Sequence, residues 1–293
     1  MAERLSDIEE RIDSIEQLHS VVSAYRGIAA ARLRDAQHRL DGVRSYAATV
    51  GNAIGHALGL MAGDDATMAA PPRRGAHLVI VLCSEQGFVG NFNTRMLDEA
   101  ERLAESGDPA DRAFFIVGDR GLALATERGL AVDWSAPMAA HADEVTSLAN
   151  RLAVALYDRL EDAGLSRASI LHAAPGQGTF DVVDKALIPF DFSRFPSVLR
   201  PVAPITTMPL DELVASLAEE YVFAELYEAV MLSYAAENQT RMLAMVSART
   251  NVRNRLDDLT AKARRMRQEE ITAEVTELAA GADAGADWRP PGQ

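Results

Sequence analysis

The sequence is poor in cysteine, in long apolar runs and in positive charge, and each scarcity excludes a class of protein. Cys83 is the one cysteine among 293 residues, so an intramolecular disulfide framework is excluded and a reducing compartment is expected. No apolar run approaches the ~20 residues of a membrane span, and the N-terminus is acidic where a secretory signal would be basic and then apolar. A formal net charge of −14 argues against general affinity for nucleic acid or anionic lipid. We therefore expect a soluble intracellular protein without direct membrane insertion.

Proline is absent from residues 3–58 and 210–280, and apolar residues recur there at alternating steps of four and three. This spacing, sustained for about five heptads, predicts a long helix of a coiled coil at each end of the chain. Each helix would be roughly 80–100 Å long, which is longer than a globular domain requires, so the two helices are expected to wrap around each other. His19 and Arg26 interrupt the N-terminal seam, which implies an imperfect seam or one that meets more than a partner helix.

The two predicted seams share this 4–3 spacing. The N-terminal seam is Ile8, Ile12, Ile15, His19, Val22, Arg26, Ala29, Leu33, Ala36, Leu40 and Val43. The C-terminal seam is Met231, Ala235, Asn238, Met242, Met245, Arg249, Val252, Leu256, Leu259, Ala263 and Met266.

Between the helices, short apolar runs alternate with helix-like segments. Strands are predicted at 77–83, 113–117 and 168–173, and helices near 92–105 and 142–162. The segment "PGQG" (175–178) predicts a hairpin turn into a further strand. Such alternation indicates an α/β layer with a largely parallel sheet, inserted between the two helices.

The stretch "LCSEQGFVGNFN" (82–93) has the outline of a phosphate-binding corner but lacks its residues. A strand ends in a loop with Gly87 and Gly90, and a helix follows, so free N–H groups and the helix dipole could attract an anion. The Gly-Lys-Ser/Thr ending of a P-loop and the third glycine of a dinucleotide fingerprint are both missing. A tight turn whose glycines allow close packing or positive φ is therefore favoured, and a nucleotide-dependent enzyme is kept as an alternative.

No other set of residues predicts catalysis. The six histidines include no pair at helical metal-ligand spacing, and one cysteine cannot form a thiolate site. Ser84 lies in no G-x-S-x-G elbow, and Cys83 at the end of an apolar strand is expected to be a core residue. The sequence predicts no catalytic residue, no metal site and no cofactor.

Positive charge is concentrated near the C-terminus. Residues 241–268 contain two acidic residues, Asp257 and Asp258, and eight cationic ones. The cationic residues are Arg241, Arg249, Arg253, Arg255, Lys262, Arg264, Arg265 and Arg267. Taken alone, this basic band fits a solvated helix face and a surface for an acidic protein partner equally well. With the two long helices included, the partner surface is favoured.

The C-terminal helix resembles that of the γ subunit of F-type ATP synthases. The segment "ITAEVTELAAGADA" (271–284) fits the family pattern of Ile-Thr, one residue, Glu, two residues, an acid, three residues and Gly-Ala. Arg267 and Gln268 match an Arg-Gln pair before it, and "ENQTRMLAM" with the later Asn251 is similar to another family run.

The resemblance extends from about residue 8 to 284. "RIDSI" (11–15) and "AAARLRDAQ" (29–37) agree with the N-terminal helix, and "CSEQGFVGNFN" resembles a structural corner of the γ middle domain without a catalytic role. The segment "LHSVVSAYRGIAA" (18–30) departs from the family, although Ala24 and Arg26 are retained. Glu85-Gln86 replaces Asp-Arg, and the tail "DWRPPGQ" extends past the usual end. These departures indicate a divergent branch, such as the γ subunit of an accessory F-type ATPase.

The resemblance implies a fold of class α/β, with a long antiparallel two-helix coiled coil and an inserted Rossmann-like domain. The segments expected are an N-terminal helix 1–62, a linker 63–76, the α/β domain 77–193, a linker 194–209, a C-terminal helix 210–282 and a tail 283–293.

The function implied is that of a central-stalk rotor, which couples ion-driven c-ring rotation to ATP synthesis or hydrolysis in the α₃β₃ head. The expected partners are the α, β and ε subunits and the c-ring, at the cytoplasmic face of a bacterial plasma membrane, with the catalytic sites on β. A coiled-coil scaffold or adaptor with no rotary role is the alternative. The residues expected to contact partners are Arg26, Asn251, Arg267, Gln268, Thr272 and Glu274.

Overall fold

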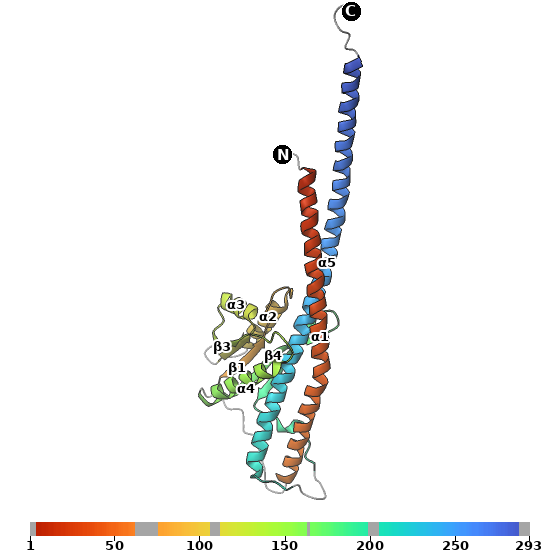
Figure 1. Cartoon of the computed structure of the whole chain (residues 1–293). Helices are drawn as coiled ribbons and strands as arrows, with labels where there is room; N and C mark the ends of the chain where they lie inside the picture. The colour runs from red at the N-terminus through yellow and green to blue at the C-terminus, as the bar shows by residue number, and fades with distance from the viewer. Residues whose placement is uncertain (1–3, 62–75, 106–111, 163–164, 199–204, 287–293) are drawn as a thin grey trace, which may run out of the picture. The chain divides into compact units, whose positions relative to one another are not determined.

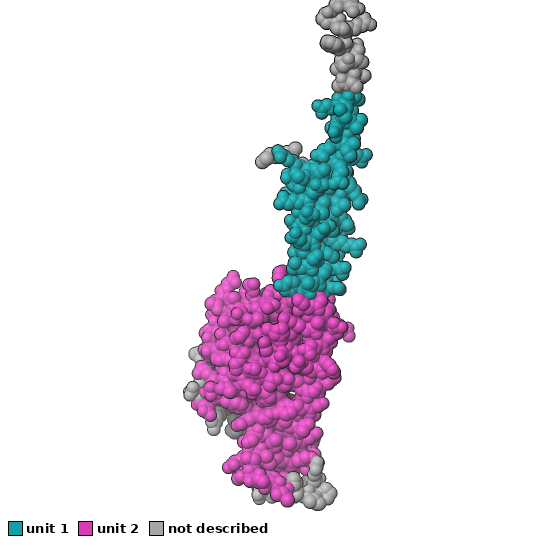
Figure 2. All heavy atoms as spheres, viewed as in Figure 1, with its two compact units in different colours: residues 1–26, 245–293 teal, residues 27–244 magenta. Residues whose placement is uncertain are grey.

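A computed structural model describes residues 4–61, 76–105, 112–162, 165–198 and 205–286. The chain divides into two compact units (Figure 2). Unit 1 comprises residues 1–26 and 245–293, and unit 2 comprises residues 27–244. Residues 287–293 of the predicted tail and residues 63–75 of the predicted linker 63–76 lie outside the described residues.

The described elements are two long terminal helices with a five-stranded sheet and shorter helices between them (Figure 1). In chain order they are α1 (Leu5–Met61), β1 (His77–Leu82), α2 (Phe92–Glu105), β2 (Arg112–Val117), α3 (Asp119–Glu127), β3 (Val132–Ala136), α4 (Val145–Asp162), β4 (Arg167–Pro175), β5 (Phe180–Ile188), a 3₁₀ turn (Phe192–Arg194) and α5 (Leu210–Ala286). The predicted fold class is confirmed, and α5 ends four residues beyond the predicted position.

The sheet has the order β3-β2-β1-β4-β5 and is parallel except for β5. The predicted hairpin turn at 175–178 joins β4 to the antiparallel β5. Successive side chains of a strand point to opposite faces, and Leu78, Ile80 and Leu82 accordingly lie in one core while Val79 and Val81 lie in the other. The first core is closed by α1, α4 and α5, and the second by α2 and α3.

Two elements of the sheet region were not expected from the sequence. β3 is a five-residue edge strand whose side chains alternate between partly buried and exposed, so it offers no apolar run. α3 has nine residues, follows Gly118 at a φ of 100°, and contains Gly121. Short length and glycines of this kind are more typical of turns.

Helix α5 is buried on nearly every side between Val222 and Arg241. It shares one core with α1, through Ala36 and Leu40, and with the sheet. A helix that is enclosed on several sides loses the one-sided apolar stripe of a surface helix. This segment therefore fixes the sheet to the helix pair within unit 2.

In unit 1, the ends of α1 and α5 pack as an antiparallel pair. Ile8 is fully buried against Leu259 and Ala263. Farther along α1 the pairing moves backward along α5, where Arg249 Nε lies 3.5 Å from His19 Nε2. An antiparallel pair has this order of contacts.

The N-terminal seam is imperfect at Arg26, as expected, and the C-terminal seam is wrong at Arg249; both residues are exposed. Val22 and Ala29, one heptad apart on either side of Arg26, are buried. Burying a guanidinium requires a charged or hydrogen-bonding partner, whereas a small turn of the helix leaves it in solvent. His19, the other polar interruption, is partly buried.

Candidate functional site

The loop after β1 lies at the topological switch point of the sheet. β1 is flanked by β2 on one side and β4 on the other, and the chain runs outward through β2 and β3 before it crosses back to β4. Open α/β sheets bind their ligands at such a point, outside the carboxyl ends of the strands. The loops that would line a ligand crevice here are 83–91 and 176–179.

The polar groups of the first loop are bonded within the chain. Ser84 is buried, and its N–H donates to Asn93 Oδ1 over 2.8 Å. Asn93 Nδ2 donates to Ser84 Oγ over 2.9 Å, and that hydroxyl donates to Gln86 O over 3.1 Å. Fewer donors therefore remain for a phosphate.

A carboxylate of the chain occupies the anion position at the start of α3. Glu85 Oε2 accepts hydrogen bonds from Asp119 N at 3.2 Å and from Met138 N at 2.8 Å. A helix N-terminus attracts a phosphate through the same kind of N–H group. The Glu85 carboxylate thus accepts the N–H hydrogen bonds that a bound phosphate accepts in other folds.

Helix α5 fills the space between the two strand-end loops. Arg241 donates from Nε to Gly87 O over 3.3 Å and from Nη2 to Gln86 O over 3.4 Å. Gln239 Nε2 donates to Gly176 O over 2.9 Å, in the loop after β4. One helix therefore bonds to both sides of the switch point.

Arg241 is held there by a buried ion pair with Glu237, four residues earlier on α5. Their side chains are 6% and 5% exposed. Arg241 Nη1 also donates to Asn238 Oδ1 over 3.4 Å. Burial raises the pKa of Glu237, whereas attraction and a hydrogen bond from Arg241 lower it. The cavity left beside these groups, lined also by Arg32 and Tyr234, has a volume of about 10 Å³, which is room for about one water molecule.

The structure also shows the environment of Cys83 and the arrangement of residues that could bind a metal. Cys83 is buried, and burial raises the pKa of its thiol to about 12. It is therefore an inert thiol at neutral pH. In the described part of the chain, no three His, Cys, Asp or Glu residues are grouped as metal ligands.

We predict that the isolated chain binds no nucleotide at the 84–90 loop. The reasons are the missing motif residues, the internal carboxylate of Glu85 and the presence of Arg241 in the crevice. Calorimetric titration with Mg·ATP is expected to give no heat of binding. A micromolar site that disappears when Gly87 and Gly90 are both replaced would contradict this prediction.

The second candidate region is the C-terminal end of α5 in unit 1. α5 continues past the beginning of α1 (Figure 1), and every residue from 267 to 279 is exposed. Ile271, Val275 and Leu278, spaced by four and three residues, are 55%, 60% and 68% exposed. A single helix with an exposed apolar stripe is typical of a segment that binds a partner.

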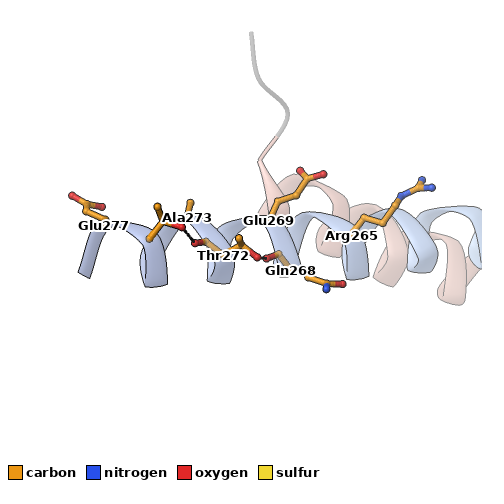
Figure 3. A pocket seen from close by; sticks show the side chains of 7 residues that line it. Arg265, Gln268, Glu269, Thr272, Ala273 and Glu277 are labelled. Carbon is orange, nitrogen blue, oxygen red and sulfur yellow. Dashed lines mark hydrogen bonds between the residues drawn. The ribbon is translucent and has the colours of Figure 1, made fainter. Parts of the chain in front are cut away.

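A shallow groove runs along another face of this end (Figure 3). Its lining residues, from one helix, are Arg265, Gln268, Glu269, Thr272, Ala273, Thr276 and Glu277. Thr272 and Thr276 donate their hydroxyls to the carbonyls of Gln268 and Thr272, both over 2.7 Å.

The predicted contact residues fall into different environments. Gln268 and Thr272 share the groove, and Glu274 is exposed on the same end of α5. Arg267 instead pairs with Glu9 of α1, with 2.6 Å between Nη2 and Oε1, and both side chains are about half exposed. The Arg-Gln pair of the sequence is therefore divided between two faces.

The remaining two predicted contact residues, Arg26 and Asn251, are exposed and line neither the groove nor the crevice.

One residue of the predicted basic band is buried and is not part of an exposed surface. Arg241 is buried and neutralised by Glu237, so it does not contribute to an exposed cationic surface. The sequence signal for its role was an acid and an arginine four residues apart in a stretch without a polar face. Glu85 and Gln239 were also missed, because their partners lie 34 or more residues away in the sequence. Asn93 was missed although its partner Ser84 is nine residues away.

Comparison with known proteins gives one family. The family model described as ATP synthase matches residues 4–284. Two curated relatives, both named "ATP synthase gamma chain", are 29% identical to this chain. The one from Solibacter usitatus aligns over 287 residues, 96% of this chain and 98% of its own, and the one from Salinibacter ruber over 310, covering 96% and 97%.

Solved structures show the same fold. A chain from "Euglena gracilis mitochondrial ATP synthase, OSCP/F1/c-ring, rotational state 3" is 14% identical, with a TM-score of 0.64 and coverage of 99% of this chain and 98% of that one. A chain from "Tetrahymena thermophila mitochondrial ATP synthase - central stalk/cring" is 19% identical, with a TM-score of 0.56 over 78% and 99%. Because the family model spans both long helices and the sheet, this chain belongs to the family of ATP synthase gamma chains.

Proposed function

We infer that this chain is the central-stalk rotor subunit of an F-type ATP synthase or ATPase. The observation that carries the inference is the family match over residues 4–284, which includes both terminal helices and the sheet between them. The chain would couple rotation of a c-ring to ATP synthesis or hydrolysis in an α₃β₃ head. The crevice at its strand-end switch point is filled by α5, which favours catalytic sites on partner subunits.

The partners we propose are the α, β and ε subunits and the c-ring. The Euglena and Tetrahymena structures are described as assemblies containing F1, a central stalk or a c-ring, and the fold shared with them supports the same role here. No helix in the described ranges is long and apolar enough to span a membrane. We place the chain peripherally, at the cytoplasmic face of a bacterial plasma membrane.

The end of α5 has the asymmetry that such a rotor requires. Its apolar stripe, its polar groove and the Arg267–Glu9 pair present different chemistry in different directions. A shaft of this kind inside a ring of three β subunits makes different contacts with each of them. Differential contact is what allows one orientation to favour a different nucleotide state in each subunit.

Replacing Arg267 by alanine tests the most specific prediction about a single residue, which is that Arg267 contacts a partner subunit. If its guanidinium contacts β in some rotary positions, its loss is expected to cost about 2–5 kcal/mol of interface energy and to reduce ATP-driven rotation or complex stability. If the guanidinium serves only the half-exposed pair with Glu9, the cost is about 1 kcal/mol or less.

Arg253 is the matched control for Arg267, because it is an exposed arginine of the same band. Arg253→Ala is expected to have the smaller effect in the same reconstituted complex. A third variant, Glu9→Gln, removes the partner of Arg267 within the chain. If Glu9→Gln reproduces the whole effect of Arg267→Ala, the proposed contact with β is wrong.

A reconstitution experiment distinguishes the rotor function from the alternative function of a coiled-coil scaffold. Mixed with α and β subunits of its own organism, the chain is expected to form a complex with three α and three β copies per chain and to support ATP hydrolysis by it. A chain that binds neither subunit would favour the scaffold.

A further inference from the structure

Two groups of charged and polar residues attach the sheet to α5 within unit 2. We call the first the crevice joint, which consists of Glu237, Gln239 and Arg241 with the carbonyls of Gln86, Gly87 and Gly176. We call the second the edge joint, which consists of Glu225 and Glu228 of α5 with Lys185 of β5 and Arg194 of the 3₁₀ turn.

The edge joint is centred on a buried carboxylate. Glu225 is 2% exposed, and its Oε1 lies 2.7 Å from Arg194 Nη2 and 3.2 Å from Lys185 Nζ. Glu228 lies 3.9 Å from the same lysine and pairs at 3.0 Å with Arg44 of α1. The joint therefore connects β5, the turn after it and both long helices.

The two joints hold the sheet at separate heights on α5. At 1.5 Å of rise per residue, Glu225 and Glu237 are roughly 18 Å apart along the helix. One attachment would let the sheet pivot about it, whereas two separated attachments resist both pivoting and twisting. The apolar core between them resists displacement by close packing, and the two joints add directional resistance, because hydrogen bonds weaken steeply when their angles change.

We propose that the crevice joint and the edge joint transmit torque between the sheet and α5, and that Arg241 is the positioning residue of the crevice joint. This inference rests on the proposed rotor function. It assigns a mechanical role to the place where other doubly wound folds bind a ligand. Arg241 suits the role because its planar fork contacts two carbonyls and a carboxylate at once.

The test uses a variant that keeps stability while it removes the joint. Glu237→Leu combined with Arg241→Met replaces a buried ion pair by apolar residues of similar volume, a change that is often neutral or stabilising. It nevertheless removes the bonds to Gln86 and Gly87. The matched control is Asp35→Leu with Arg39→Met, an exposed acid–arginine pair with the same i,i+4 spacing on α1.

Each protein is assembled with its α, β, ε and membrane partners in vesicles, and the membrane potential generated per ATP hydrolysed is measured. We expect the Glu237/Arg241 double variant to hydrolyse ATP and to generate less potential per ATP, while the control matches the wild type. In the free chain, the melting temperature should stay close to that of the wild type. The Gln86 amide, which bonds to the Glu237 carboxylate, should exchange at least about tenfold faster.

A double variant with a normal potential per ATP, despite fast exchange at Gln86, would overturn the joint. If the double variant does not fold, Arg241→Lys carries the same expectation for the potential per ATP, because it keeps a charge opposite Glu237 and loses the fork to the Gln86 and Gly87 carbonyls. A wild-type chain that fails to assemble or to generate any potential would instead overturn the rotor function itself, so the two failures are distinguishable.

Discussion

Replacing Gly121 by alanine is expected to destabilise unit 2 severely, by about 3 kcal/mol or more. Gly121 lies in the first turn of α3, and a Cβ added there would be 2.0 Å from Cys83 Cβ and 2.5 Å from its Sγ. Atoms this close cannot be accommodated by a rotamer change, so α3 or the end of β1 must move. Chemical denaturation of the free chain measures the loss, as a lower midpoint at an unchanged slope.

Two further variants make the result for Gly121 interpretable. Gly42→Ala, on α1, meets no atom within 4 Å and is expected to stabilise the chain by about 0.4–1 kcal/mol. Cys83→Gly combined with Gly121→Ala removes the clashing atoms and should recover part of the loss. A Gly121→Ala protein within about 0.5 kcal/mol of the wild type would show that the packing of α3 on β1 is wrong.

The single substitution Arg241→Met is expected to cost about 3–5 kcal/mol at neutral pH, because it leaves a buried carboxylate without its partner. The loss should depend on pH. Burial already raises the pKa of Glu237, and Arg241 opposes that rise, so the variant's Glu237 has a higher pKa still. The unfolded chain keeps a glutamate pKa near ~4.3.

The sign of the dependence follows from proton binding. Between ~4.3 and the raised pKa of Glu237, the native variant holds a proton that the unfolded chain does not, so its stability falls as pH rises. Wild-type Glu237 also has a raised pKa, although a lower one than in the variant, so the deficit relative to wild type grows as pH rises above the wild-type value and is smaller at acidic pH. Unfolding titrations from pH 5 to 8 measure it, with Glu237→Leu/Arg241→Met as a pH-independent control. A deficit that is the same at every pH would mean that Glu237 is not the group left unpaired.

The sequence predicted the elements that have strong periodicity. The two long helices follow from heptad spacing, and three of the four parallel strands, β1, β2 and β4, follow from apolar runs. The hairpin strand β5 follows from the turn predicted at 175–178. β3 was missed because the polar residues Asp133 and Ser135 interrupt it, so that it contains no apolar run. The domain boundaries at 62, 76, 193, 209 and 282 stay predictions, since the two compact units divide the long helices at 26 and 244.

The sequence predicts the turn that follows β1, but it does not predict what fills the crevice beside that turn. Gly87 and Gly90 indicated a turn without a nucleotide motif, yet nothing local showed that Arg241, more than 150 residues later, would fill the crevice. The same limit applies to Gly55 and Gly59 of α1. Added Cβ atoms there would lie 2.7 Å from Pro196 O and 2.5 Å from Val198 O, a close approach of distant segments that helix spacing alone does not reveal.

The partner-contact residues were chosen by resemblance, and their roles stay predictions. The structure changes the argument for one of them, because Arg267 already has a partner in Glu9. Its contact with β must therefore compete with a half-exposed internal pair. Gln268 and Thr272 both line the groove on α5 (Figure 3), where the Thr272 hydroxyl donates to the Gln268 carbonyl within the same helix.

Observation of rotation in single complexes tests the central claim most directly. The chain would be assembled with its α and β subunits, the head fixed to a surface, and a probe attached to this chain at exposed Val154 of α4 through a Val154→Cys substitution, with Cys83 buried and unreactive. On addition of Mg·ATP, we expect unidirectional rotation of the probe in three steps per turn, one for each β subunit. ATP hydrolysis by the assembled head without rotation of the probe would contradict the rotor function.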